Sequence, residues 1–138
     1  EGVTTLDYTF SGCLALTEVE LPSTLKYIWS SAFWACKCFE SFTVPDGVTQ
    51  IFPAVFFDCE ELTSVVIPEG VTDIGDYAFY GCGDLTDVYY AGTEEQKAKI
   101  SINYYGNGNT SGSAPLGTAS HTAGDSTQTL TMRHRIFV

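Results

Sequence analysis

Residues 62–84 read LTSVVIPEGVTDIGDYAFYGCGD, and this pattern recurs along the chain with a step of 23 residues. Three residue types follow the step most clearly, in the columns Pro22, Pro45 and Pro68; Phe10, Phe33, Phe56 and Phe79; and Cys13, Cys36, Cys59 and Cys82. A unit this short cannot bury its apolar side alone, so it needs a neighbouring unit above and below. The spacing therefore predicts a repeat solenoid.

Conservative apolar columns keep the same step. They include Leu16, Phe39, Leu62 and Leu85; Val19, Phe42, Val65 and Val88; and Ile28, Ile51 and Ile74. The first unit joins this register only after a one-residue deletion, which aligns Leu6 with Ile74. We therefore expect about four stacked coils within residues 1–92.

The two halves of each unit differ in spacing. Val65 and Ile67 alternate like the inward side chains of a short strand, and Pro68 ends that strand because it has no N–H to donate. Between Val71 and Cys82 the apolar residues lie three or four positions apart, which favours a helical or tight-turn segment. The expected fold class is an α/β repeat solenoid with short parallel strands and short helical or turn segments.

The pattern changes after Val88. Residues 93–105 are predicted to form a C-terminal helical cap, in which Thr93 caps the helix, glutamates follow it and lysines lie near the other end. Such a cap is needed because the last coil would otherwise expose its apolar edge. Residues 106–138 are rich in Gly, Ser and Thr, which predicts a flexible tail. No comparable cap precedes Val3, so we expect further repeats or another domain before it.

The charge distribution argues against several classes of partner. The net charge is −11, and residues 1–92 hold fourteen acidic residues against only Lys26 and Lys37. Such a surface repels phosphate backbones and anionic lipid, so nucleic acid and bare membrane are poor partners, although acidity also serves solubility alone. The longest apolar run, residues 51–57, contains a proline and is too short to cross a bilayer.

Catalytic motifs are absent from the sequence. Both histidines, His121 and His134, lie in the predicted tail, and no phosphate-binding loop, nucleophile elbow or zinc-protease motif occurs. We therefore expect a protein that is not an enzyme and that needs no cofactor or metal.

The cysteine column is interpreted as a set of buried free thiols, because small apolar side chains pack well at core positions. Neighbouring coils lie about 4.8 Å apart, so disulfides between them remain an alternative. One ligand per coil along a line does not form a tetrahedral metal site. Cys38 lies outside the column, at a position where Ala15, Glu61 and Asp84 indicate a solvent-facing turn.

The outward positions of the predicted strands are free to vary, whereas their inward neighbours are constrained by the core. Repeat proteins commonly bind extended partners on such a face. We take it as the candidate partner-binding face, suited to a protein with basic groups, or else as a merely solvated surface. Its residues are Glu18, Glu20, Ser41, Thr43, Ser64, Val66, Asp87 and Tyr89.

A stripe of large aromatic residues follows the phenylalanine column. Exposing such side chains is unfavourable, so packing beneath a neighbouring segment is the preferred interpretation. The alternative is an exposed ridge that binds a sugar or a protein, since aromatic faces are good anchors. The residues concerned are Trp29, Trp34, Phe57 and Tyr80.

The unit at 62–84 closely resembles the BspA-like leucine-rich repeat. That pattern contains leucine–threonine, an alternating strand, isoleucine–proline, valine–threonine–x–isoleucine–glycine, alanine–phenylalanine and a cysteine, as this unit does. The resemblance covers residues 2–92, and it departs from the pattern where Trp29 and Phe52 replace the usual glycine. It implies a leucine-rich-repeat solenoid that ends in a strand and a short helix.

The resemblance also implies a place of action. Such repeats are typical of secreted and cell-surface proteins of mouth and gut bacteria and of some parasitic protists, and several of them resemble adhesins. The expected partner is therefore a protein of a host matrix or of another cell surface. Two other hypotheses stay open: the repeats form a passive structural spacer within a larger surface protein, or the aromatic stripe binds glycans.

Overall fold

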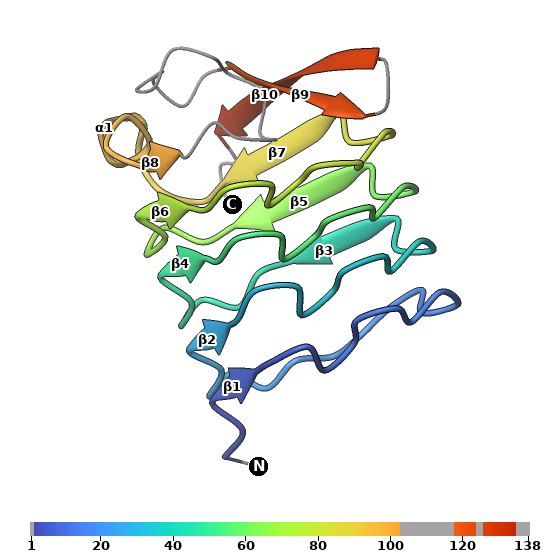
Figure 1. Ribbon diagram of the computed structural model, residues 1–138. Coiled ribbons are helices and arrows are strands. Elements are labelled where there is room, and N and C mark those ends of the chain that lie inside the picture. The colour runs from blue at the N-terminus through green and yellow to red at the C-terminus, as the bar shows by residue number, and fades with distance from the viewer. Residues whose placement is uncertain (1, 103–117, 124–125, 135–138) are drawn as a thin grey trace.

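The protein winds into a stack of about four coils in its computed structural model, which describes residues 2–102, 118–123 and 126–134 (Figure 1). One parallel sheet, sheet A, has strands β1 (Thr5–Leu6), β2 (Tyr27–Ile28), β4 (Gln50–Ile51), β6 (Asp73–Ile74) and β8 (Ser101–Ile102). A second, sheet B, has β3 (Ser41–Thr43), β5 (Ser64–Ile67) and β7 (Asp87–Tyr90) in parallel. The predicted parallel-strand solenoid with a 23-residue period is confirmed.

The strand register follows the sequence columns. Ile28 pairs with Ile51, and Ile51 pairs with Ile74, each one 23-residue step further along the chain. Leu6 pairs with Ile28, whereas a full step would place it beside Trp29. The one-residue deletion in the first unit is therefore confirmed.

A continuous stack of phenylalanine rings runs through the core. The ring centroids of Phe10 and Phe33, Phe33 and Phe56, and Phe56 and Phe79 are 5.3, 5.8 and 5.5 Å apart, with interplanar angles of 9°, 8° and 5°. Phe42 meets Phe33 and Phe56 edge-on at 4.9 Å from each. The leucine, valine and isoleucine columns complete a buried core that extends from Leu6 to Ile100. Stacking of identical positions is thus what buries each coil.

Tight turns between the sheets form a third side of each coil, and here the helical alternative predicted for Val71 to Cys82 is wrong. After β6 the chain continues in turns, as it does in the coils below (Figure 1). Backbone N–H groups in these turns donate to the next coil: Phe33 to Val55 O at 3.1 Å, and Phe56 to Ala78 O at 2.9 Å. Those donors are therefore not available to a carbonyl four residues back, as an α-helix requires.

Two positions in each turn segment have positive φ, which further excludes a helix. They recur at the 23-residue step as Tyr8, Ser31, Ala54 and Tyr77, and as Gly12, Ala35, Asp58 and Gly81. A non-glycine residue in this conformation costs about 1–2 kcal/mol. The inter-coil bonds offset that cost, since Ala35 and Asp58 donate 2.7 Å bonds to Phe57 O and Tyr80 O. At Gly81 a Cβ would also lie 3.0 Å from the Cα of Asp58.

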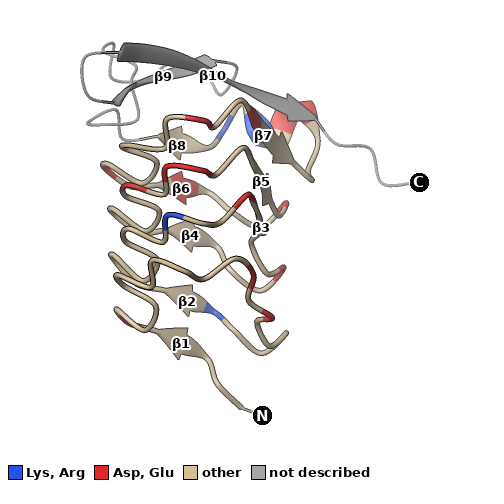
Figure 2. Ribbon diagram, turned by 90° about the vertical axis from the view of Figure 1, so that its right-hand side faces the viewer, with Lys and Arg blue, Asp and Glu red and all other residues tan. Residues whose placement is uncertain are grey.

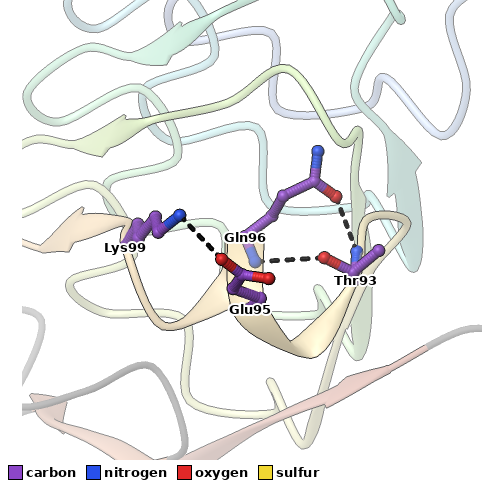
Figure 3. A network of polar contacts seen from close by, with 4 residues as sticks. All are labelled: Thr93, Glu95, Gln96 and Lys99. Atoms are coloured by element: carbon purple, nitrogen blue, oxygen red, sulfur yellow. Dashed lines mark hydrogen bonds and ion pairs between the residues drawn. The ribbon is translucent and has the colours of Figure 1, made fainter.

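The helix α1 (Glu94–Lys97) begins as predicted but does not act as the expected cap. Thr93 and Gln96 exchange two hydrogen bonds in a capping box, at 2.8 and 3.1 Å, and Lys99 pairs with Glu95 at 3.1 Å (Figure 3). However, α1 buries none of its own residues, and a cap must cover the apolar edge of the last coil. The chain instead buries Ile100 and returns to sheet A as β8. The predicted helical cap is therefore not supported.

Part of the predicted cap and tail lies outside the described residues, namely 103–117, 124–125 and 135–138. Within the remainder, β9 (Thr118–Ala123) and β10 (Ser126–His134) pair antiparallel, and β10 runs parallel to β7. The flexibility of the tail stays a prediction. Among residues 2–102, 118–123 and 126–134, no helix has the length and apolar character that crossing a bilayer requires.

Replacement of Phe56 by alanine tests the ring stack, because this fully buried ring has a stacked partner on both sides. We expect Phe56→Ala to lower the free energy of unfolding by about 3–5 kcal/mol. Chemical denaturation followed by circular dichroism measures the change. Leu14→Ala, at a residue that is 57% exposed, serves as the control and should shift stability by less than about 0.5 kcal/mol. Equal effects of the two variants would contradict a core built on stacked rings.

Candidate functional site

The outward side chains of sheet B form two columns across the coils. Ser41, Ser64 and Asp87 are in register in one column, and Thr43, Val66 and Tyr89 in the other. Between these columns the inward side chains of Phe42, Val65 and Val88 are buried in the core. Three coils thus carry six of the eight predicted face residues on one sheet.

The remaining two residues, Glu18 and Glu20, belong to the coil below, where residues 16–20 form no strand. Both are exposed, as are Ser41 and Thr43. The four face residues on β5 and β7 are half-buried instead. The predicted face therefore continues over the coils, but its lower end, at Glu18 and Glu20, has no regular strand.

A groove of about 620 Å³ lies where β3 and β5 end. Thr43 and Val66 of the predicted face line it. Two acidic residues that the sequence analysis missed, Asp46 and Glu69, line it too. The other described lining residues are Val44, Pro68 and Ala91. A signal for the two acids was available, because they occupy one column beside the turn glycines Gly47 and Gly70.

Acidic residues occur in nearly every coil, and basic residues are few (Figure 2). Lys37 is held by Glu60 at 2.8 Å, Lys97 by Glu94 at 2.8 Å and Lys99 by Glu95 at 3.1 Å. Lys26 is the remaining lysine of residues 2–102, and it has no ion pair within that range. The repeats therefore carry an excess of unneutralised carboxylates on their surface.

Three of the four predicted ridge aromatics lie together on the side of the coils that the turn segments form, which we call the turn edge. Phe57 is 6.5 Å from Trp34 and 4.9 Å from Tyr80 between ring centroids. Tyr77, which the sequence analysis missed, adjoins Phe57 and Tyr80 at 6.3 and 5.7 Å. Trp34 and Tyr77 are 46% and 43% exposed. We call these four residues the turn-edge aromatic cluster.

Trp29 lies in a separate group. Its ring stacks on Tyr27 of β2 at 5.5 Å and is 4.4 Å from Phe52, which follows β4. Trp29 and Tyr27 are 39% and 44% exposed. The predicted stripe is thus divided between the turn edge and sheet A.

All five cysteines are free, so the prediction of buried free thiols is confirmed for Cys36, Cys59 and Cys82. Each of these three S–H groups donates to a phenylalanine carbonyl of the coil below, over 3.0, 3.2 and 3.0 Å, with Phe10, Phe33 and Phe56 as acceptors. Burial raises the pKa of the Cys36 thiol to about 12. A hydrogen bond with Cys82, together with burial, raises the pKa of Cys59. Cys36 and Cys59 therefore act as packing groups rather than nucleophiles.

Cys13 and Cys38 differ from the buried three. Both are half-buried, and Cys38 donates to the carbonyl of Leu14 at 3.0 Å. Across residues 2–102, 118–123 and 126–134, no three His, Cys, Asp or Glu side chains are placed to hold a metal ion. The groups that this surface offers for contact are carboxylates, hydroxyls and aromatic rings.

Comparison with known proteins identifies a repeat family and solved structures that this chain resembles. The family model for the BspA type leucine rich repeat region matches residues 3–107 in six copies. A leucine-rich repeat protein of T. pallidum is 34% identical, with a TM-score of 0.61 over 63% of this chain and 41% of that one. One from Bacteroides ovatus is 30% identical, with a TM-score of 0.59 over 75% of this chain and 30% of that one. The chain thus spans less than half the length of either structure. No curated protein matches the sequence.

Thiol labelling of the folded protein tests whether the cysteines of the column are buried and unreactive. At pH 8 we expect iodoacetamide to modify Cys13 and Cys38 and to spare Cys36 and Cys59, because thiols of raised pKa remain protonated and burial blocks access. Peptide mass spectrometry locates the label, and labelling in denaturant shows that every cysteine can react. Modification of Cys59 at the rate of Cys38 in the folded protein would contradict the burial of the Cys59 thiol.

Proposed function

The chain belongs to the BspA-type leucine-rich repeat family, and from that premise we propose that it is a protein-binding module of a secreted or cell-surface protein. Leucine-rich repeat domains generally mediate protein interactions through their repeat scaffold. The partner docks on the outward face of sheet B and belongs to a host matrix or to another cell surface. The role is adhesive, and it needs no cofactor.

The observation that carries this proposal is the groove on the outward face of β3 and β5. It combines an open volume of about 620 Å³ with a threonine, two valines and two carboxylates. The inward side chains on the same strands are buried in the core, so substitutions of the outward ones disturb the fold less. A surface of this kind supplies specificity through side chains while the stacked backbone keeps them in fixed positions.

The charge of the face supports a particular mode of recognition. Its exposed acids attract basic partners during diffusional encounter and repel acidic ones. Affinity then depends on the few residues that become fully desolvated at the centre of the contact. The half-buried Val66 lies in the groove and is suited to that central position.

Two matched arginine substitutions test the location of the binding face. Thr43 and Thr5 are both exposed threonines on strands, the first on sheet B and the second on sheet A. We expect Thr43→Arg to weaken binding at least tenfold, because it fills the groove and repels a basic partner, and Thr5→Arg to leave binding unchanged. Biolayer interferometry against an immobilised panel of extracellular matrix proteins measures the affinities.

Equal affinities of the two variants would remove sheet B from the proposal. Absence of binding to any protein of the panel by the unmodified chain would favour the alternative in which the repeats serve as a passive spacer.

A second candidate function rests on the turn-edge aromatic cluster. Trp34, Phe57 and Tyr80 come from three successive coils and present aromatic faces at one edge. Aromatic rings in such an arrangement can stack against sugar rings, so we also propose a glycan-binding role for this edge.

Tryptophan fluorescence distinguishes this second role. The chain has two tryptophans, so Trp29→Phe leaves Trp34 as the sole reporter and Trp34→Phe leaves Trp29. We expect a panel of soluble glycans to quench Trp34 in a saturable way, because a sugar stacked on the exposed indole changes its surroundings, and to leave Trp29 unaffected. A flat response of both variants over the whole panel would remove the glycan role.

A further inference from the structure

We infer that the groove on sheet B binds a basic side chain, arginine or lysine, of an extended segment of the partner protein. This inference rests on the proposed function and specifies the chemistry of its partner. Its starting point is that Asp46 and Glu69 line the same groove on successive coils, and both are exposed.

The spacing of these two residues follows from the fold. Each directly follows a proline, Pro45 or Pro68, within a tight turn, and the strands before these turns, β3 and β5, are paired in parallel register. Parallel strands lie about 4.8 Å apart, so the two carboxylates stand about one coil apart on one side of the groove. A guanidinium or ammonium group placed between them can donate hydrogen bonds to both carboxylates.

The chain's own Lys26 shows that a cation is accommodated beside this site. Its Nζ lies 3.1 Å from the place where a Cβ on Gly47 would be, next to Asp46. One coil higher, a Cβ on Gly70 would meet no cation: its neighbours would be the carbonyl oxygens of Asp46 and Val48, each at 3.9 Å, and the methyl group of Thr49 at 4.0 Å. Within residues 2–102, however, neither Asp46 nor Glu69 forms an ion pair with Lys26 or with any other lysine, so both carboxylates are open to a cation from the partner.

The remaining lining of the groove suits the aliphatic part of a basic side chain. Val66, Pro68 and Ala91 provide apolar surface, and the Thr43 hydroxyl is available at the lower strand. Lysine and arginine bury their methylene stems against such surface while the charged group stays at a polar rim. A volume of about 620 Å³ is larger than one side chain needs, so neighbouring residues of the segment enter as well.

Other cationic or charged partners fit this site less well. In the described part of the chain, no group of three potential metal ligands exists, so an isolated metal ion lacks a coordination shell here. Nucleic acid carries the wrong charge for a surface of net charge −11. An extended peptide, in contrast, can cross the coils of β3 and β5 while one side chain occupies the groove.

The test uses two octapeptides, one alternating arginine with serine and one with citrulline in place of every arginine. Citrulline keeps the shape of arginine and removes its charge. We expect fluorescence anisotropy to show saturable binding of the arginine peptide, at least tenfold weaker binding of the citrulline peptide, and weakening with added salt. The unmodified 138-residue chain and its variants are compared.

The variants move binding in opposite directions. We expect Glu69→Gln to weaken the arginine peptide about three- to tenfold, and Lys26→Met to strengthen it about two- to threefold by removing the competing cation. Glu40→Gln is the matched control: it makes the same chemical change at an exposed glutamate just before β3, away from the groove lining. It should change the affinity less than about 1.5-fold.

Three outcomes would overturn the inference. The first is equal affinity for the arginine and citrulline peptides, and the second is equal weakening by Glu69→Gln and Glu40→Gln, which would reflect general acidity alone. The third is no peptide binding by a chain that still binds a matrix protein through Thr43, which would leave the proposed function standing. Failure of Thr43→Arg to affect any binding would instead count against the proposed function itself.

Discussion

Each coil of this protein depends on its neighbours for three sets of contacts that it cannot make alone. The turn segments send their backbone N–H groups to carbonyls of the adjacent coil, and the phenylalanine of each coil stacks on the next at 5.3 to 5.8 Å. The cysteine thiols add a third set of contacts between the same coils. Because all three sets recur at equivalent positions in successive coils, the 23-residue spacing must be kept through the core. The outward side chains are free of that requirement.

Sequence columns were sufficient to predict the period, the inward residues of sheet B and the free thiols, because each depends on residue type at a fixed step. For the turn segments the sequence left helix and tight turn both open, and only the turn is correct, since apolar spacing of three and four is shared by helices and by tight turns that return to the core. Positive φ is also invisible when Tyr8, Ser31 or Ala35 adopts it in place of glycine. For the cap, the sequence predicted that Thr93 caps the helix but could not show that α1 buries none of its residues.

The candidate site was predictable only in part, for a related reason. Alternation along β3, β5 and β7 identified the face, because inward and outward positions follow from the strand period. The groove depends on where the strands end and how the following turns project, which alternation does not describe. Asp46 and Glu69 were therefore missed, although they lie in one column. The aromatic stripe was divided for a similar reason, since Trp29 follows β2 whereas Trp34 lies in the turns.

The stacking of coils also determines how the molecule responds to mechanical load. A pull along the axis of the stack acts on the terminal coil first, because each coil is bonded only to its immediate neighbours. Release of one 23-residue coil replaces a spacing of about 4.8 Å by an extended chain of about 75 Å. The interfaces below it keep their ring stacks and hydrogen bonds. Such a module lengthens in steps under tension and dissipates mechanical energy at each step. The coils that still carry the outward face remain folded meanwhile.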